Sequence, residues 1–313
     1  MTAPLTIGID FGGTSIKLAT VCGSELVGEI RRIPTQEFSC QEELLSEIVS
    51  VVGELRAESP GVTGVGMGVP GAVDFASGKT YHLTNVAGWS GLPLRQILTD
   101  RIGLPTVLEN DANCMTFAEW RYGAAAGSQQ AVCVTLGTGV GGGLILNGSL
   151  YRGSTFAAGE IGQMSIDHRG VPGPYGNSGA LERYIGNRQI SELAASLYAK
   201  HGQASPADPS PEGLTLLAQD GDPVALEVWG EVAGCLGACL INIVYLLNPE
   251  TIVIGGGVAQ AGDLLFAPLR RKLASGLTGE CIDHLQILPA RYGNTAGIIG
   301  SAALAAESGS AVA

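Results

Sequence analysis

The sequence predicts an α/β protein of two lobes, each opened by the same strand–turn–strand unit. Strand-like and helical runs follow one another through the whole chain of 313 residues, which is typical of a layered α/β fold. An apolar run, a Gly/Thr turn and a second apolar run occur at residues 5–21 and again at 131–146. This repeat indicates a duplicated fold unit. We expect a small lobe at residues 1–112, with a closing helix at 297–313 packed back on it, and a large lobe at 113–296.

The elements expected in the small lobe follow from the spacing of apolar residues. Apolar runs bounded by glycine predict strands, and apolar residues that recur every three or four positions predict helices. The strand at 62–69 ends at a Pro-Gly pair, which is a common turn signal. In order, we expect strands at 5–10, 15–21, 62–69 and 106–108 and helices at 41–58, 92–102 and 112–122.

The large lobe alternates strands and helices in the same way. A loop rich in Gly and Pro at 169–179 and a flexible connector at 202–211 interrupt it. The uncharged stretch from Val232 to Pro249 contains Asn242 and ends in a turn, so we expect a buried helix rather than a membrane span. The remaining expected elements are strands at 131–136, 140–146 and 251–254 and helices at 181–200, 223–247 and 297–306.

Composition excludes several classes of protein. Hydrophobic residues make up 45% and charged residues 15% of the chain, which is too apolar for a disordered protein. The formal net charge of -12 repels nucleic-acid phosphates, so we expect no nucleic-acid partner. Seven cysteines form no C-x-x-C pair, which favours a reduced, cytoplasmic location. A strand-like run begins at Ile7, so we expect neither a signal peptide nor a membrane anchor.

Glycine is unusually frequent, with 47 residues, and it clusters in three turns where a backbone can approach a ligand closely. In the first turn, Gly12 and Gly13 expose N–H groups that can hold phosphate oxygens. Thr14 adds a hydroxyl and Lys17 a positive charge, and Asp10 could hold Mg²⁺ directly or through water. The turn is neither a Walker A loop nor a Rossmann fingerprint. An ordinary hairpin turn is the alternative.

The other two glycine clusters suit the same kind of ligand. The second repeats the chemistry of the first with Gly137, Thr138 and Gly139. Two such hairpins, one in each lobe, could hold one triphosphate from two sides across a cleft. The third contains Gly256 and Gly257 and follows a strand, at the edge where open α/β sheets bind ligands. A flat base could lie against this backbone, and a tight strand–helix turn is the alternative.

Two groups of polar residues suit a ligand with many hydroxyls. Asp111 could accept a proton from a hydroxyl during phosphoryl transfer, and Asn110 could bind neighbouring hydroxyls. For an aspartate at this place the alternative is a helix N-cap. Glu160, Gln163 and Glu182 flank the Gly- and Pro-rich loop, and their oxygens suit polyhydroxy ligands. Taken singly, each is more typical of a surface residue than of a binding site.

As an ordered set, these segments resemble the ROK family of sugar kinases and repressors. The resemblance covers nearly the whole chain, through residues 7–14, 66–71, 85–89, 109–113, 136–143, 159–162, 248–250, 254–257 and 293–297. It implies the two-lobed actin/hexokinase/Hsp70-like ATPase fold, ATP and Mg²⁺ as cofactors, and phosphorylation of a hexose. Because the phosphate turn follows so soon after residue 1, we expect no helix-turn-helix of the kind that ROK repressors carry.

The resemblance also assigns roles to residues. It implies that Asp111 is the general base that activates the 6-hydroxyl of the sugar. Sugar contacts are implied for Gly71, Thr84, Asn85, Asn110, Glu160, Gln163 and Glu182. Phosphate or metal contacts are implied for Asp10, Gly12, Gly13, Thr14, Lys17, Gly137, Thr138 and Gly139, and adenosine contacts for Gly256 and Gly257.

The chain departs from the family pattern at two places. Gln163 stands where the family commonly has a histidine that contacts the sugar. The family also commonly has three zinc-binding cysteines, at the places of Gly173, Tyr175 and Ala180. We therefore expect no structural zinc, and a loop held instead by Pro172, Pro174 and packing of Tyr175.

Together these observations predict a cytoplasmic, homodimeric kinase with glucose as the first choice of substrate. N-acetylmannosamine, N-acetylglucosamine, allose and fructose are alternative substrates, and polyphosphate is an alternative phosphoryl donor. A sugar-sensing protein without catalytic activity and an ATPase of the actin type are alternatives of other classes.

Overall fold

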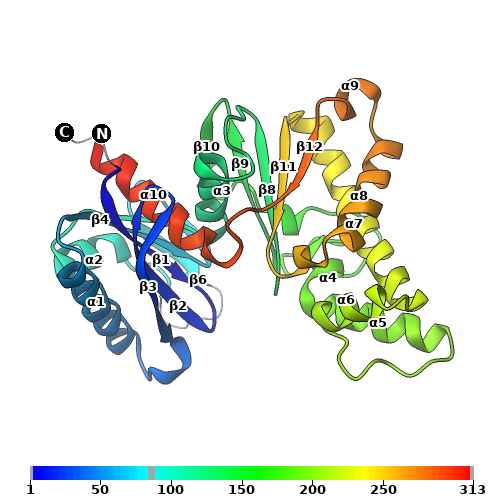
Figure 1. Cartoon of the computed structure of the whole chain (residues 1–313), viewed down its shortest axis with the longest axis horizontal. Coiled ribbons are helices and arrows are strands. Elements are labelled where there is room, and N and C mark those ends of the chain that lie inside the picture. Colours follow the sequence, from blue (N-terminus) through cyan, green and yellow to red (C-terminus); the bar gives the residue numbers. More distant parts are fainter. Residues whose placement is uncertain (1–2, 84–88, 311–313) are drawn as a thin grey trace. The chain divides into compact units, whose positions relative to one another are not determined.

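The chain divides into two compact units, which are described separately (Figure 1). The computed structural model describes residues 3–83 and 89–310. Thr84 and Asn85, two of the expected sugar contacts, lie outside the described residues. Unit 1 contains residues 1–127, 150–158 and 294–313, and unit 2 contains residues 128–149 and 159–293. The lobe boundaries that the sequence suggested stay a prediction.

Unit 1 is built on a five-stranded sheet. Its strands are β1 (Leu5–Phe11), β2 (Ser15–Cys22), β3 (Glu25–Pro34), β4 (Val62–Val69) and β7 (Thr106–Asn110), in the order β3-β2-β1-β4-β7. A separate hairpin consists of β5 (Gly71–Asp74) and β6 (Lys79–Leu83). The helices are α1 (Gln41–Glu58), α2 (Leu94–Ile102), α3 (Asp111–Tyr122) and α10 (Ala296–Ser310), with a short 3-10 turn η1 (Thr35–Glu37).

Unit 2 is built on a second five-stranded sheet. The strands of this sheet are β8 (Ala131–Leu136), β9 (Val140–Leu146), β10 (Ser149–Tyr151), β11 (Thr251–Gly255) and β12 (Gln286–Pro289), in the order β10-β9-β8-β11-β12. Leu150 and Tyr151 of β10 are counted with unit 1. Its helices are α4 (Glu182–Ile185), α5 (Asn187–Lys200), α6 (Pro211–Gln219), α7 (Pro223–Leu247), α8 (Asp263–Gly276) and α9 (Gly279–Ile282). Three 3-10 turns are η2 (Ile161–Gln163), η3 (Val258–Ala261) and η4 (Gly293–Thr295), the last at the border of the two units.

The two sheets share one topology. In unit 1, β1 pairs antiparallel with β2 and parallel with β4, and β4 pairs parallel with β7. In unit 2, β8 pairs antiparallel with β9 and parallel with β11, and β11 pairs parallel with β12. The predicted α/β fold with a duplicated strand–turn–strand unit is therefore confirmed. In both copies the Gly/Thr turn joins the antiparallel pair.

Helix α10 lies directly on the sheet of unit 1. A Cβ atom on Gly8 would overlap the carbonyl oxygen of Ile298, and one on Gly66 would overlap that of Ser301. The hydroxyl of Ser301 accepts a hydrogen bond from the N–H of Ile9 at 3.1 Å. The hydroxyl of Thr6 donates to the carbonyl of Ala302 at 3.0 Å. Glycines in β1 and β4 thus permit backbone contact between this helix and the strands.

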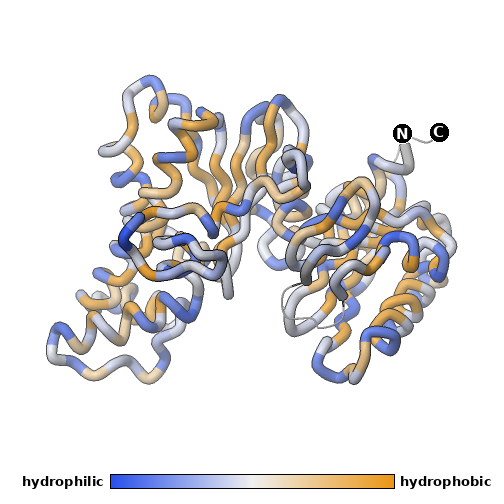
Figure 2. Tube along the Cα trace, turned by 180° about the vertical axis from the view of Figure 1, so that it is seen from behind, coloured by the Kyte–Doolittle hydropathy of each residue, from blue (hydrophilic) through white to orange (hydrophobic). Residues whose placement is uncertain are grey.

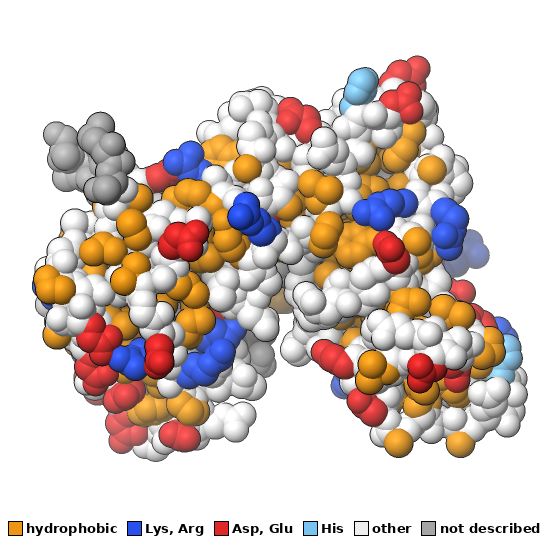
Figure 3. Space-filling view, viewed as in Figure 1, with side chains coloured by type: hydrophobic (Ala, Val, Ile, Leu, Met, Phe, Trp, Pro, Cys, Tyr) orange, Lys and Arg blue, Asp and Glu red, His pale blue; other side chains and the backbone are white. Residues whose placement is uncertain are grey.

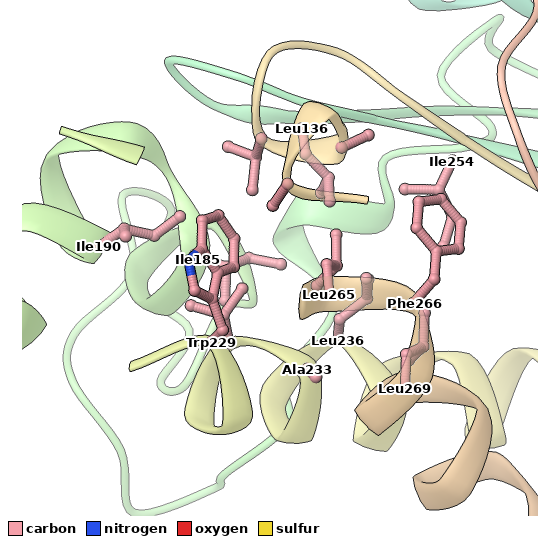
Figure 4. Packing of buried hydrophobic residues seen from close by; sticks show 14 of the residues in the cluster. Leu136, Ile185, Ile190, Trp229, Ala233, Leu236, Ile254, Leu265, Phe266 and Leu269 are labelled. Atoms are coloured by element: carbon pink, nitrogen blue, oxygen red, sulfur yellow. The ribbon is translucent and has the colours of Figure 1, made fainter. Parts of the chain in front are cut away.

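Each unit has its own hydrophobic core. The larger core of unit 1 packs the buried face of α1 against the sheet, around Phe11 and Trp89, whose ring centroids are 5.2 Å apart. In unit 2, side chains of α7 and α8 share one core with β8 and β11. Figure 4 shows Leu236 and Leu265 next to each other in this core and Trp229 beside Ile185. Hydrophobic segments follow the strands and the inner faces of the helices (Figure 2).

Helix α7 contains most of the uncharged stretch, from Val232 onwards, that the sequence predicted as a buried helix. Asp222 caps it by accepting the N–H groups of Val224 at 2.8 Å and Ala225 at 2.9 Å. It ends where Asn248 adopts a left-handed conformation with φ 45°. Among the described residues it is the one helix long and apolar enough to span a membrane by composition. It packs against α5, α6 and α8 inside unit 2 and contributes to its core.

The structure differs from the expected elements in several places. The helix expected at 181–200 is two helices, because Gly186 is extended between them (φ -67°, ψ 156°). The next residue, Asn187, donates its N–H to the carbonyl of Gly137 at 2.9 Å, which explains the break. The apolar pattern of the sequence did not indicate β3, the β5–β6 hairpin, α6, α9 or β12.

The acidic composition is visible at the surface. Figure 3 shows acidic side chains gathered over the region of α1. The exposed acidic residues of this helix include Glu42, Glu43, Glu54 and Glu58. The opposite face of the same helix is apolar and buried, with residues such as Leu45, so the helix is amphipathic.

Candidate functional site

The first Gly/Thr turn is bonded to η1, directly after β3, and carries an ion pair at its base. The N–H of Gly12 donates to the carbonyl of Ser15 at 3.1 Å, which closes the turn. Thr35 donates its N–H to the carbonyl of Thr14 at 3.1 Å and its hydroxyl to that of Gly13 at 3.0 Å. These bonds fix the backbone between β1 and β2. The turn is therefore preformed rather than dependent on a ligand for its shape.

Asp10 and Lys17 face each other across this hairpin. Their register pairs them directly, and Nζ of Lys17 lies 3.3 Å from Oδ2 of Asp10 and 3.4 Å from the carbonyl of Asn294. A Cβ on Gly297 would lie 2.8 Å from Cγ of Asp10, so the carboxylate rests against the first turn of α10. The positive end of that helix favours a negative charge there.

Asp10 fits the demands of a magnesium ion that arrives with a nucleotide. Among the described residues, no group of three or more His, Cys, Asp or Glu side chains could hold a metal. Mg²⁺ needs no such cage, because it keeps several waters and binds through one or two carboxylates together with substrate phosphates. One carboxylate beside a lysine and a phosphate-binding turn meets that requirement.

The second Gly/Thr turn, in unit 2, is closed by its own backbone and by Glu182. The N–H of Gly137 donates to the carbonyl of Gly139 at 2.9 Å. Oε2 of Glu182 accepts the N–H of Val140 at 3.0 Å, and a Cβ on Gly139 would overlap that carboxylate. The structure therefore brings together Glu182, an expected sugar contact, and Gly139, an expected phosphate contact.

Gly137 and Gly257 have no structural need to be glycine. A Cβ on Gly137 would meet no atom of the described residues within 4 Å, and one on Gly257 would meet only Oε1 of Glu212, at 3.8 Å. Gly257 has ordinary helical dihedrals (φ -61°, ψ -41°). Gly256 differs, because its φ of 87° and its contact with the carbonyl of Leu136 require glycine. The space above the first two is what a closely approaching ligand needs.

A cavity of about 320 Å³ lies beside the third glycine cluster, wholly within unit 2. Its volume is within the range of small-molecule sites. Phe266 and Ile254, which Figure 4 shows side by side, form part of its apolar wall. Polar groups on its lining come from Gln260, Asp263 and Arg270. Gly256 lines the cavity, as expected for an adenosine contact, whereas Gly257 is adjacent to it in the chain.

Asn110 and Asp111 form the junction between β7 and α3. Asn110 is the N-cap: its Oδ1 accepts the N–H of Asn113 at 3.1 Å. Its Nδ2 donates to the carbonyl of Gly71 and to Oδ1 of Asp111, both at 3.1 Å. The N–H of Ala112 also donates to Oδ1 of Asp111, at 2.8 Å. The helix N-cap, which the sequence offered as the alternative role for Asp111, is therefore Asn110. Asp111 is the first residue of the helix, where a carboxylate is electrostatically favoured.

Glu160 and Glu182 lie near each other in unit 2. Withdrawal of the Glu160 carboxyl from water, followed by repulsion from Glu182, raises the pKa of Glu160. A hydroxyl-rich ligand that donates hydrogen bonds to both groups would relieve that repulsion. Oε1 of Gln163 is buried and has no hydrogen-bond partner among the described residues, which leaves an acceptor available close to Glu160 in the chain.

Backbone and amide hydrogen bonds hold the loop between Met164 and Leu181. Isolated bridges join Ser165 to Ala180 and Pro172 to Ser178. Asn177 donates from Nδ2 to the carbonyl of Gln163 at 2.9 Å. The expectation that packing of Tyr175 holds the loop is wrong, because this side chain is 79% exposed. Its ring has no core to enter, since the loop closes on its own backbone.

Sequence reasoning missed two residues beside Asp111. Glu109 is 3% exposed, and its Oε2 accepts from Nε of Arg152 at 2.6 Å. Glu109 had a signal, because it precedes the two functional candidates directly. Arg152 had none, since it lies in no glycine cluster and 43 residues away in the chain.

Comparisons with known proteins give a consistent result. A profile of the ROK family matches residues 6–308. A glucokinase of Halalkalibacterium halodurans is 33% identical over 307 residues, which cover 94% of this chain and 92% of the relative. A glucokinase of Streptomyces coelicolor is 31% identical over 314 residues, which cover 97% and 98%. The crystal structure of a ROK family glucokinase from Streptomyces griseus in complex with glucose and AMPPNP is 32% identical, with a TM-score of 0.79 over 97% of this chain and 99% of that one.

Proposed function

Because the chain belongs to the ROK family, we propose that it is a hexose kinase that transfers the γ-phosphoryl group of ATP to the 6-hydroxyl of glucose. Its fold is the actin/hexokinase-like ATPase fold. The similarity to glucokinases over more than nine-tenths of the chain supports glucose as the substrate. The solved relative with glucose and AMPPNP supports a sugar and an adenine nucleotide as ligands.

The observation that carries the proposal is the geometry of the β7–α3 junction. The Asp111 carboxylate is fixed by two hydrogen bonds to one oxygen, from Asn110 and from the N–H of Ala112. We propose that Asp111 accepts the proton of the sugar hydroxyl as the oxygen attacks the γ-phosphorus. A positioned base contributes about 10²- to 10⁴-fold to such a transfer. Asn110 and the neighbouring Gly71 backbone orient the same hydroxyl.

The remaining polar residues bind substrate in this proposal. Glu160, Gln163 and Glu182 accept hydrogen bonds from hydroxyls of the sugar. The two Gly/Thr turns and Lys17 bind phosphate oxygens, and the cavity beside Gly256 takes the adenosine. When bound, Mg²⁺ neutralises charge on the phosphates, with Asp10 as its protein ligand. The Glu182 contact with the second turn means that one carboxylate serves both the sugar and the phosphate region.

Several further properties are part of the proposal. We propose that the protein contains no structural zinc, which the protein-only contacts that close the 164–181 loop support, namely its two backbone bridges and the Asn177 hydrogen bond. We also propose a cytoplasmic homodimer. Exposed hydrophobic side chains on α7, namely Leu226, Tyr245 and Leu246, support an interface with a second copy.

A panel of sugars and donors tests the function. Purified protein is assayed with glucose, N-acetylmannosamine, N-acetylglucosamine, allose and fructose, each with ATP and with polyphosphate. We expect the highest kcat/KM for glucose with ATP. A preference for an N-acetylhexosamine would instead favour the Gln163 acceptor as a contact for the amide N–H. Binding of glucose without turnover by any donor would contradict the kinase proposal and favour a sugar-sensing protein.

A further inference from the structure

A buried ion pair lies beside the proposed base. Nε of Arg152 donates to Oε2 of Glu109 at 2.6 Å, and the two side chains are 20% and 4% exposed. Both residues belong to unit 1. Arg152 lies in the segment 150–158, which is part of unit 1 although the residues before and after it in the chain belong to unit 2. Neither residue has a role in substrate binding or proton transfer so far.

The second carboxylate oxygen of Glu109 reaches the residues on both sides of Asp111. Oε1 accepts the N–H of Asn110 at 2.9 Å and Nδ2 of Asn113 at 3.0 Å. Asn110 in turn donates from Nδ2 to Oδ1 of Asp111 at 3.1 Å. A continuous series of hydrogen bonds therefore leads from Arg152 through Glu109 and Asn110 to the proposed base.

The guanidinium group of Arg152 is itself held in place. Its central carbon lies 3.8 Å from the centroid of the Phe75 ring, a favourable cation–π arrangement. The planar group is thus fixed between an aromatic face and a carboxylate. Without Arg152, the buried charge of Glu109 would have no compensating partner in this pair, and it would disfavour a second negative charge on Asp111.

Cys114 shows that these charges act within one small region. It is fully buried in α3, next to the same junction. Burial raises the pKa of its thiol well above the usual value, and Glu109, Asp111 and Asp10 raise it further, whereas Arg152 lowers it. Among the described residues, the charged groups that act on Cys114 are thus Glu109, Asp111, Asp10 and Arg152, and Asp10 in turn pairs with Lys17.

We propose that Glu109 and Arg152 are positioning residues: Glu109 orients Asp111 through Asn110, and Arg152 offsets the charge of Glu109 so that the Asp111 carboxylate stays ionised for proton transfer. The inference rests on the proposed function, because it takes Asp111 as the base. Arg152 balances the charge of Glu109, and Glu109 holds both asparagines that flank the base.

A double-mutant cycle tests this role through the pH dependence of kcat. Arg152→Met keeps the aliphatic stem but leaves Glu109 uncompensated. We expect kcat to fall about 10- to 100-fold, as for a displaced catalytic group, and the acidic limb of the kcat profile to move to higher pH. Glu109→Gln leaves the positive charge of Arg152 and should move the limb to lower pH. The double variant, with neither charge, should return the limb towards that of the wild type.

Controls separate positioning from stability. Arg101→Met removes an exposed pair in the same unit, in which Arg101 lies 2.7 Å from Glu42, and should leave kcat and the pH profile unchanged. Arg152→Lys keeps the charge without the fork of donors, so it should restore the position of the limb and part of kcat. It also serves as the test if the methionine variant fails to fold.

Two results would overturn the inference. The first is a set of variants with lower melting temperatures but wild-type kcat and wild-type pH profiles, which would make the pair structural only. The second is a limb that moves in the same direction in both single variants. Absence of turnover in the wild type would instead remove the proposed function, and the base with it.

Discussion

The unoccupied space above Gly257 leads to a prediction about nucleotide binding. The chain has ordinary helical dihedrals there, and the nearest described atom to an added methyl group would be Oε1 of Glu212, at 3.8 Å. Gly257→Ala should therefore keep the free energy of unfolding, or raise it by up to about 1 kcal/mol through a less flexible unfolded chain. If adenosine lies against this backbone, the methyl group meets the ligand instead.

The size of the effect follows from the cost of one extra methyl group in a closely packed contact. Overpacking of this kind costs about 1–3 kcal/mol, which corresponds to roughly 5- to 150-fold weaker binding. The assay is isothermal titration with a non-hydrolysable ATP analogue, alongside thermal unfolding. Glucose affinity should not change, because the expected sugar contacts lie elsewhere in the chain.

Two other glycines give matched controls. Gly53→Ala lies at an open position of α1 and should stabilise the protein by about 0.5–1 kcal/mol with unchanged nucleotide affinity. Gly256→Ala should destabilise it, because φ is 87° and the carbonyl of Leu136 occupies the space. Wild-type nucleotide affinity in a stable Gly257→Ala variant would refute the reasoning that unexplained glycines indicate ligand contact.

Three further predictions concern the sugar side of the site and the metal. Asp111→Ala should lower kcat at least about 100-fold with little change in ATP affinity, and steady-state kinetics with near-normal turnover would remove it from the base role. Because the folded-state pKa of Glu160 is raised, its contribution to stability is present at low pH and is lost as pH rises through that pKa. Glu160→Gln should therefore raise the melting temperature at pH 7 but not below the ordinary glutamate pKa. The rise should be slight, because the residue is only partly withdrawn from water and solvent screens its charge; an equal effect at both pH values would contradict this. Metal analysis of purified protein should find no stoichiometric zinc, and one zinc per chain would disprove the metal-free loop.

The duplicated fold could be predicted from the sequence, because each strand–turn–strand unit lies within one short stretch of the chain. Each Gly/Thr turn stands between two apolar strands in one short stretch, and the strand order that follows is the same in both units. Features that depend on contacts between residues far apart in the chain could not be predicted in this way. The break at Gly186 depends on a bond from Asn187 to Gly137, and the pairing of Arg152 with Glu109 depends on how a distant segment returns to unit 1.

The candidate site divides in the same way. Neighbouring residues such as Asn110 and Asp111 could be recognised together, and the structure joins them by a hydrogen bond. The contact of Glu182 with Val140 spans 42 residues, and no spacing rule indicates it. The Tyr175 expectation failed because an aromatic side chain was assumed to pack, whereas the loop bonds to itself and leaves the ring in solvent.

The position of α10 has a consequence for biosynthesis. Its backbone lies on β1 and β4, through Gly8 and Gly66, yet it leaves the ribosome after all of unit 2. Every residue of unit 2 is translated before residue 294, so that unit can complete its core while the N-terminal sheet is still uncovered. Strand β1 is therefore made before unit 2, but the helix that packs on it is made after unit 2. A nascent chain that stops before α10 leaves the sheet of unit 1 exposed to aggregation and to chaperones.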